Sequence, residues 1–423
     1  MIVFLRVFLL LGLSALLFNG CAGNKPSTSP EGDTASTASS SASPDIRVCL
    51  TDDGAAAALS FNGNYRVEME EANYRFDASI GEMNIMVQGG SLILKNQKRF
   101  FELSPPQSLH FRPENADNKF TWNKVDYYGA LTLHYQDDGY FVVNTLPLEL
   151  YLQGVVANEI PTNQSEYREA VVAQAIASRS YALHRIDNPV SEIFDLHADK
   201  PDQVYRGREK ASSLSDRAVT STQGVVLTQL NQPAAVQFHS TSGGVLESRA
   251  NGDAALAGGA NTYSPDSVDG EDNDKVSPFY RWVENPGVET ILRNLKRIFE
   301  LDNAMVQRWY DNGFHFDVVI SDRKPSGRVN EVVIKVNDRS FVLDRDDKIQ
   351  QAFADESGKP LPSTLFFLKQ PGENTETVYI LGAGAGHGKG MSQWGAVGLA
   401  LKGYDHRYIL AFYYPDYTIS QYY

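Results

Sequence analysis

The sequence predicts an α+β fold, with mixed or antiparallel sheets in a β-rich part and a few helices. Short apolar runs typical of strands follow one another between residues 46 and 95. Residues 131–144 have the pattern of a hairpin, with alternating apolar residues on two arms and a turn at Asp138-Gly139. Residues 165–186 then lack Gly and Pro and carry apolar residues at helical spacing, so the period changes without a regular βαβ alternation.

The same patterns predict the remaining elements. In chain order they are an opening strand over 46–50, a second hairpin over 224–239, an exposed loop over 251–278, a helix over 288–300, strands within 316–343, and a helix from Ser392 to Leu401 that ends at Gly403.

The chain of 423 residues has an ordinary globular composition, with 42% hydrophobic and 21% charged residues. Its formal net charge is −14 at pH 7, and no segment supplies a dense basic stripe. A general nucleic-acid binder needs such a stripe to balance phosphate charge, so this class is excluded. The charge does not choose among neutral substrates.

The first 21 residues predict a lipoprotein signal peptide. Arg6 supplies an early positive charge, residues 7–18 form an apolar stretch that is short for a membrane span, and Gly20 precedes Cys21. The Gly-Cys ending resembles the bacterial lipobox, in which the cysteine carries the lipid. We therefore expect a membrane anchor at Cys21; the alternative is ordinary cleavage that leaves this thiol free.

Residues 22–44 form a low-complexity Ser/Thr/Ala/Pro segment and predict a disordered tether. If Cys21 carries lipid, Cys49 is the one cysteine left in the sequence. An intramolecular disulfide is then impossible, and a Cys-rich structural zinc site is excluded by count.

A glycine-dense stretch, LGAGAGHGKGMSQWGAVGLALKG over 381–403, indicates that the backbone comes close to another group. The dinucleotide fingerprint needs glycines at i, i+2 and i+5, and each candidate pair here meets another residue at the last position. The P-loop pattern fails as well, because Gly388-Lys389 is followed by Gly390 instead of Ser or Thr. A phosphate-binding loop is therefore disfavoured.

Two other chemistries have weak support. Ser240 and Ser242 follow His239, but neither serine lies in a G-x-S-x-G pattern, and residues adjacent in sequence seldom form a triad. The eight histidines are scattered, without H-E-x-x-H or a close pair at ligand spacing. We predict no metal and no cofactor, and a zinc site built from distant residues stays an open alternative.

Glu159 is the candidate general acid. Within LPLELYLQGVVANEIPTN (146–163) it lies near Val155, Val156 and Ile160. Apolar surroundings would desolvate its carboxyl group and raise the pKa, as a general acid near neutral pH requires. The alternative is a strand-end or helix-start residue that accepts backbone hydrogen bonds.

Eight ordered blocks extend over most of the chain, and the G-H-G-x-G-M-S-Q-W-G-A signature at 386–396 is the most specific. The others are LPLELYLQGVVANEIP, REAVVAQAIASRSYAL, DQVYRG, AVTSTQGVVL, FHSTSGGVLES, SGRVNEVVI and LPSTLFFL. In these blocks the chain resembles the SpoIID/LytB family of bacterial cell-wall proteins. The resemblance implies an N-terminal β-rich part over 45–145 and a catalytic core over 146–423, with a catalytic cleft between the β-rich and helical parts.

The resemblance also implies a peptidoglycan lytic transglycosylase in which Glu159 is the catalytic acid and base. Such an enzyme cleaves the MurNAc–GlcNAc bond without water and leaves a 1,6-anhydroMurNAc end in cell-wall remodelling. One carboxylate serves both steps, unlike the two carboxylates of ordinary glycosidases. Nine residues are expected to bind the glycan, each with a structural alternative: Gln174, Arg179, Gln203, Tyr205, His239, Ser240, Ser242, His387 and Gln393.

Within that set, Tyr205 is more typical of a core, as is Trp394, which could instead stack on a sugar. Glu159 and His387 are expected to face one sugar groove. Some relatives bind zinc through cysteines near the catalytic block; this chain has none there, which again predicts no metal.

The family also includes amidase enhancers. The alternative function is therefore a non-catalytic glycan-binding lipoprotein that enhances a partner N-acetylmuramoyl-L-alanine amidase. The expected partners are peptidoglycan glycan strands, the membrane through the lipid anchor, and in the alternative a cell-wall amidase, but no nucleic acid. The expected location is the cell envelope, on the periplasmic or extracytoplasmic face.

Overall fold

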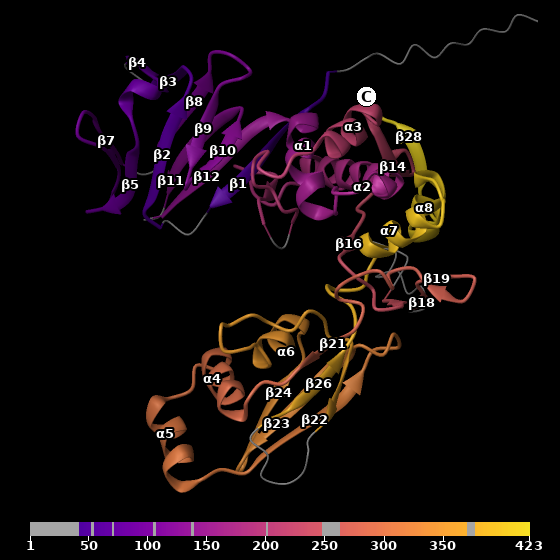
Figure 1. Ribbon diagram of the computed structural model, residues 1–423. Coiled ribbons are helices and arrows are strands. Elements are labelled where there is room, and N and C mark those ends of the chain that lie inside the picture. The colour runs from indigo at the N-terminus through magenta and orange to yellow at the C-terminus, as the bar shows by residue number, and fades with distance from the viewer. Residues whose placement is uncertain are drawn as a thin grey trace, which may run out of the picture. The chain divides into compact units, whose positions relative to one another are not determined.

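Figure 1 shows the chain as a computed structural model. The structure describes residues 42–51, 55–69, 72–104, 107–136, 139–199, 202–247, 263–369 and 377–423. The α+β class is confirmed, because helices accompany several mostly antiparallel sheets. The expected signal peptide with Cys21, most of the tether, the turn residue Asp138 and much of the 251–278 loop lie outside the described residues.

Two sheets occupy the N-terminal part of the described chain. The larger has the order β13-β1-β12-β11-β8-β3-β4, and the second has the order β10-β9-β2-β5-β6-β7. Burial alternates along β11, so one side of this strand faces the core. The strands are β1 (Asp45–Thr51), β2 (Ala57–Asn62), β3 (Tyr65–Met69), β4 (Ala72–Phe76), β5 (Met83–Gln88), β6 (Ser91–Lys95), β7 (Phe100–Leu103), β8 (Gln107–Pro113), β9 (Lys119–Trp122), β10 (Val125–Tyr128), β11 (Ala130–Gln136), β12 (Gly139–Pro147) and β13 (Leu196–His197).

Helix α2 (Arg168–Asp187) is the centre of the helical part. Four helices pack against it: α1 (Leu148–Glu159), α3 (Ser213–Ser221), α7 (Gln393–Leu401) and α8 (His406–Tyr413). Its residues 170–180 are all buried, and the alanines among them let neighbouring helices approach closely. Because its apolar residues join those of the two sheets in one hydrophobic cluster, sheets and helices share a core.

Short strand pairs connect segments that are far apart in the sequence. Strand β14 (Val225–Gln229) pairs with β15 (Gln232–Pro233) and with the C-terminal β28 (Thr418–Gln421). Strand β16 (Phe238–His239) pairs in parallel with β27 (Met391–Ser392), which brings the glycine-dense stretch beside the histidine and serine block. Two further pairs are β17 (Val245–Leu246) with β18 (Ser264–Pro265) and β19 (Ser267–Val268) with β20 (Glu271–Asp272).

A second hydrophobic cluster forms between residues 288 and 380, where no boundary was predicted from the sequence. It joins two three-stranded antiparallel sheets and three helices. The strands are β21 (Trp282–Glu284), β22 (Phe316–Arg323), β23 (Val329–Val336), β24 (Arg339–Leu343), β25 (Phe366–Lys369) and β26 (Tyr379–Gly382); the helices are α4 (Val288–Ile298), α5 (Asn303–Asn312) and α6 (Asp346–Ala352).

Most predicted elements are confirmed. Gln136 faces Gly139 in the β11–β12 hairpin, and the predicted helix over 165–186 is α2, preceded by one 3-10 turn at Ser165–Tyr167. Helix α7 begins after Ser392, whose side chain accepts a hydrogen bond from the Gly395 N–H at 3.1 Å. Helix α1 was not predicted, because its sequence is apolar on most sides and has no clear helical stripe.

The expected cleft between the β-rich and helical parts is not shown by the described residues and stays a prediction. Among those residues, no helix combines the length and the apolar character that crossing a membrane requires.

Candidate functional site

Glu159 is the last residue of α1, and its half-buried carboxylate is held by two N–H groups from distant segments. The Val204 N–H donates to Oε1 at 2.7 Å, and the Gln393 side chain donates from Nε2 to Oε2 at 3.0 Å. Hydrogen bonds from two directions fix the carboxylate plane and stabilise its ionised form. The structural alternative for Glu159 predicted a strand-end or helix-start residue that accepts backbone hydrogen bonds. Glu159 does accept one, from the Val204 N–H, but it lies at the end of a helix.

A buried polar chain runs beside Glu159. Tyr151 donates from its hydroxyl to Gln203 Oε1 at 3.1 Å, and Gln203 Nε2 reaches the Ser178 carbonyl at 3.3 Å. Gln174 donates to the Ser178 hydroxyl at 3.0 Å, and its own Oε1 is buried without a hydrogen-bond partner among the described residues. Burial, followed by the negative charge of Glu159, raises the pKa of Tyr151 well above its ordinary value, so this hydroxyl stays a donor.

The glycine-dense stretch approaches other parts of the protein itself. A β-carbon on Gly384 would lie 2.7 Å from the Thr241 carbonyl oxygen, and one on Gly388 would lie 2.3 Å from the guanidinium carbon of Arg328. Both glycines have positive φ, 75° and 79°, which other residues rarely adopt. The glycines therefore let this stretch pack closely on the block around Thr241 and on a buried arginine.

His387 and His239 lie side by side, with ring centroids 5.5 Å apart. The Lys389 N–H donates to His387 Nδ1 at 3.1 Å, so this nitrogen carries no proton and Nε2 donates to the Phe238 carbonyl, also at 3.1 Å. Although the His387 side chain is exposed, both nitrogens face backbone groups. Desolvation of the ring, followed by the charge of Lys389, lowers the pKa of His387 to about 4, and the ring is neutral at physiological pH.

His239 is buried and neutral as well. Its Nδ1 lies 3.0 Å from the Lys389 carbonyl and donates to it, which leaves Nε2 as an acceptor without a hydrogen-bond partner among the described residues. Burial, followed by the neighbouring His387 ring, lowers the pKa of His239 well below its ordinary value.

Backbone contacts link these histidines to the Glu159 carboxylate. The Trp394 N–H donates to the Ser240 carbonyl at 3.0 Å, directly after Gln393, which holds Glu159. The Ser240 hydroxyl lies 3.3 Å from that of Thr241. Neighbouring segments thus carry Glu159, Gln393, Ser240 and the two histidines. That Glu159 and His387 face one groove stays a prediction.

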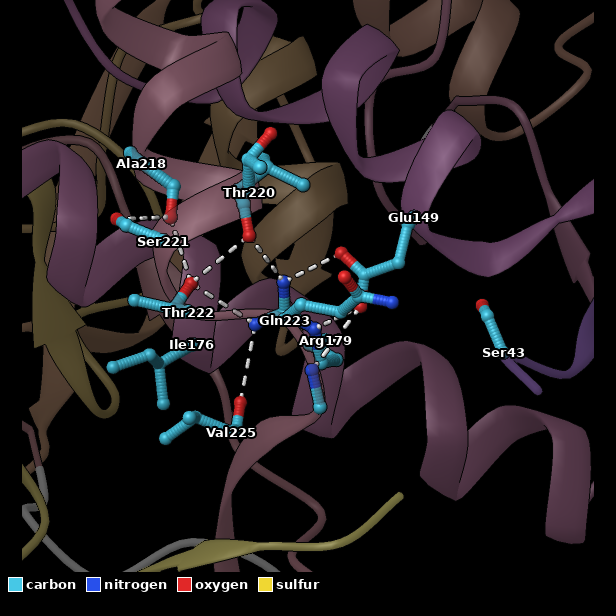
Figure 2. Close-up of polar contacts among 12 residues, drawn as sticks. Ser43, Glu149, Ile176, Arg179, Ala218, Thr220, Ser221, Thr222, Gln223 and Val225 are labelled. Atoms are coloured by element: carbon cyan, nitrogen blue, oxygen red, sulfur yellow. Dashed lines mark hydrogen bonds and ion pairs between the residues drawn. The ribbon is translucent and has the colours of Figure 1, made fainter. Parts of the chain in front are cut away.

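Arg179 has the surroundings of a structural residue (Figure 2). Its guanidinium is fully buried and donates from Nε and Nη2 to the two oxygens of Glu149, both at 2.8 Å. Further hydrogen bonds reach the Val225 carbonyl at 3.1 Å and the Thr222 hydroxyl at 3.3 Å. Its donors are thus occupied by α1 and by the chain after α3, where no sugar reaches without rearrangement.

Tyr205 and Ser242 are buried too. The Tyr205 hydroxyl donates to Asn144 Oδ1 at 2.9 Å, and its ring packs against Tyr127 and Tyr151. The partly buried Trp394 contacts Tyr167 edge-on, with ring centroids 6.4 Å apart.

Ser242 lies between two carboxyl groups. Its hydroxyl is 2.8 Å from Asp266 Oδ2 and 2.9 Å from Asp274 Oδ2, and both aspartates are fully buried. Desolvation raises the pKa of each of the two carboxyl groups above its ordinary value. Ser242 is therefore part of an internal acidic cluster.

Several residues of this region were not predicted from the sequence. Val204 and Arg328 lie inside recognised blocks, DQVYRG and SGRVNEVVI, so the block pattern could have pointed to them. Tyr151, Asp266 and Asp274 carry no such signal, since burial and partners depend on the fold. Among the residues that the structure describes, no group of three or more His, Cys, Asp or Glu side chains could hold a metal ion.

Comparison with known proteins gives two family matches. Residues 136–229, which include α1, α2 and Glu159, match the model of the stage II sporulation protein, SpoIID. Residues 266–390, which include the second core and Arg328, match a domain of unknown function, DUF8618.

Three relatives extend over most of the chain. An uncharacterized protein of Brachyspira hyodysenteriae (strain ATCC 49526 / WA1) is 28% identical over 383 residues, 89% of this chain and 93% of that protein. The amidase enhancer of Bacillus subtilis (strain 168) is 26% identical over 409 residues, 88% of this chain and 55% of that protein, so the chain spans about half of this relative. Stage II sporulation protein D of the same strain is 28% identical over 298 residues, 66% of this chain and 76% of that protein. By these matches, and by the blocks that meet around Glu159, the chain carries a SpoIID domain over residues 136–229 and is similar to members of the SpoIID/LytB family.

Proposed function

We propose that this protein is a peptidoglycan lytic transglycosylase that cleaves MurNAc–GlcNAc bonds and leaves 1,6-anhydroMurNAc ends during cell-wall remodelling. One observation carries the proposal. Three segments that are distant in sequence converge on a single half-buried carboxylate, because Val204 and Gln393 both donate hydrogen bonds to Glu159. A carboxylate oriented in this way is suited to transfer a proton at a fixed point.

Glu159 acts first as acid and then as base. The protonated carboxyl group donates its proton to the oxygen that bridges MurNAc and GlcNAc; the glycosidic bond breaks and an oxocarbenium-like centre forms at the MurNAc C1. The carboxylate then accepts the proton of the MurNAc C6 hydroxyl, whose oxygen bonds to C1. Atoms balance without water, and the two N–H donors stabilise the carboxylate that exists between the steps.

The neighbouring polar residues divide into two groups in this proposal. Gln393, Ser240, His239 and His387 form the wall that contacts the sugar, because neutral donors and acceptors suit hydroxyl and N-acetyl groups. A second group supports that wall from inside the protein, since its members are buried still more deeply, at most 1% exposed, and are bonded to other protein groups: Gln174, Arg179, Gln203, Tyr205 and Ser242.

The site is proposed to act at the cell envelope on glycan strands, with Cys21 carrying a lipid that anchors the chain to a membrane. A relative named amidase enhancer supports the second candidate, a glycan-binding lipoprotein that increases the activity of a separate N-acetylmuramoyl-L-alanine amidase. The two candidates differ in one respect: the enzyme makes new glycan ends by itself.

Purified full-length chain in detergent is incubated with peptide-free glycan strands, and the reducing ends are identified by mass spectrometry. We expect anhydroMurNAc ends with the wild type and with Glu166→Gln, which changes an exposed glutamate nearby, but not with Glu159→Gln. Ends that form equally in Glu159→Gln would refute the catalytic assignment. Wall lysis that appears only when an amidase is added, without anhydro ends, would favour the second candidate.

A further inference from the structure

A cavity of about 620 Å³ lies between the β9–β10 hairpin and the segment that leads into α3. This volume is within the range of small-molecule sites, about 300–1,000 Å³. Six of its lining residues are charged, three basic and three acidic: Lys119, Lys124, Arg208, Asp126, Glu209 and Asp216. Tyr128 adds an aromatic ring, with the Lys119 ammonium 4.9 Å from its centroid.

The walls of this cavity are held in place by close backbone contacts. Gly207 has a φ of +56°, and a β-carbon there would lie 2.0 Å from the Asp126 carbonyl oxygen. A β-carbon on Gly154 would in turn lie 2.3 Å from the Gly207 carbonyl oxygen. Because only glycine fits these contacts, the loop that carries Arg208 is pressed against both the hairpin and α1, and the cavity is preformed.

Lys124 occupies an unusual backbone position for a lysine. It is the second residue of the two-residue turn Asn123-Lys124, since Trp122 pairs with Val125, and its φ is +72°. Gly is favoured at this position of such a turn, and a bulkier residue there costs about 1 kcal/mol or more. A lysine that lines a cavity in spite of this cost points to use of its side chain.

Four of the six charged residues have contacts within the protein. Arg208 and Asp216 form an ion pair at 2.6 Å, the Asp126 carboxylate accepts a hydrogen bond from Thr121, and Lys119 lies over Tyr128. Lys124 and Glu209 are exposed, and neither forms an ion pair with another residue that the structure describes. One positive and one negative group are thus available at the same cavity.

We infer that this cavity binds a short peptide that carries both a carboxylate and an ammonium group, namely the stem peptide of peptidoglycan. The inference rests on the proposed function, because the stem peptide branches from the MurNAc residue of the same strand. Lys124 pairs with the peptide carboxylate and Glu209 with its ammonium group.

The distance from the Glu159 site allows a single strand to occupy both places. The Val204 N–H donates a hydrogen bond to Glu159, and Arg208 follows Val204 by four residues. The backbones of Val204 and Arg208 therefore lie at most about 14 Å apart. A stem peptide of five residues reaches up to about 17 Å when extended. A MurNAc bound at Glu159 is therefore close enough for its stem peptide to reach the cavity.

The test measures peptide binding to the full-length chain in detergent by isothermal titration. The probe is N-acetyl-L-alanyl-γ-D-glutamyl-L-lysyl-D-alanine, in which the lysine amine is the one ammonium group, and in a second probe this amine is acetylated as well. We expect Lys124→Glu to weaken binding of both probes at least about threefold, since it turns an attraction into a repulsion. Glu209→Lys should weaken binding of the first probe but not of the second. Lys335→Glu, an exposed lysine on β23, is the control for net charge and should bind as the wild type does.

Equal dissociation constants in wild type, Lys124→Glu and Glu209→Lys would overturn the inference, as would a failure of the wild type to bind either probe. Neither result affects the proposed function, which is judged by anhydro ends on peptide-free strands. Conversely, the expected pattern of peptide binding without anhydro ends would refute the transglycosylase and leave the peptide site in place.

Discussion

Replacing Asp266 with asparagine should remove a large pH dependence from the stability of the fold. The Ser242 hydroxyl lies within hydrogen-bond distance of both Asp266 and Asp274 but has one hydrogen, so it can donate to only one of them. Asp266 also accepts hydrogen bonds from Asn273 at 2.9 Å and Tyr413 at 2.8 Å. The arrangement is satisfied when one of the two carboxyl groups carries a proton.

The size of the effect follows from the pKa of Asp266. Burial, followed by the charge of Asp274, raises this pKa from 3.8 to about 6. Because the pKa is higher in the folded than in the unfolded chain, protonation favours the folded state, and stability falls as pH rises from 4 through 6. At about 1.4 kcal/mol for each pKa unit, ionisation of Asp266 lowers the free energy of unfolding by about 3 kcal/mol at neutral pH.

The assay is urea denaturation of wild type and Asp266→Asn between about pH 4 and pH 8. His239 and His387 have lowered pKa values and make both proteins more stable as pH rises, so the difference between the two proteins is the quantity to follow. As pH rises across this range, the free energy of unfolding of the variant should increase by about 3 kcal/mol relative to that of the wild type. In the control Asp355→Asn, where hydrogen bonds from Ser357 and Lys359 lower the pKa of an exposed carboxyl group below 3.8, the pH dependence lies mostly below pH 4, so the difference from wild type should stay nearly constant over this range. Parallel curves for wild type and Asp266→Asn would refute the reasoning.

Three further predictions concern single contacts. Arg179→Ala removes a fully buried guanidinium from its ion pair with the half-buried Glu149 carboxylate and should lower the free energy of unfolding by about 3 kcal/mol in urea denaturation, whereas a loss below about 1 kcal/mol would show that the pair is not structural. Gly388→Ala combines a positive φ with a clash against the buried Arg328 guanidinium, whereas Gly403→Ala has the positive φ alone. In thermal unfolding Gly388→Ala should lose at least about 1 kcal/mol more of the free energy of unfolding than Gly403→Ala, and equal losses would contradict the close contact with Arg328. Gln393→Leu removes one N–H donor from Glu159 and should reduce the rate of anhydro-end formation about tenfold with little change in melting temperature, so an unchanged rate would exclude an orienting role.

The elements with strong periodicity were predicted well from the sequence. The β11–β12 hairpin, α2 and α4 follow from alternating or helical spacing, which depends only on local residue order. Helix α1 was missed because its apolar residues cover most of its surface, so no period marks it. The second core was missed because no linker-like composition separates it from the rest of the chain, and its boundary depends on which residues pack together.

In the candidate site, too, some features could be predicted from the sequence and others depend on the fold. Glu159 could be chosen from its apolar setting and from the family resemblance, and its contact with Gln393 joins two blocks that the resemblance had singled out. Residue type alone could not separate Gln393 from Arg179, since both are polar and lie in specific blocks. The fold distinguishes their roles, because the Arg179 guanidinium is buried and donates its hydrogen bonds to Glu149.

The central claim is that Glu159 breaks the glycan without water. Mass spectrometry of the products tests it most directly, since an anhydroMurNAc end is one water lighter than a hydrolysed end. The account predicts that wild-type protein produces the lighter ends from peptide-free strands and that Glu159→Gln produces none. Ends of hydrolysed mass from the wild type, or lighter ends in equal amount from Glu159→Gln, would contradict it.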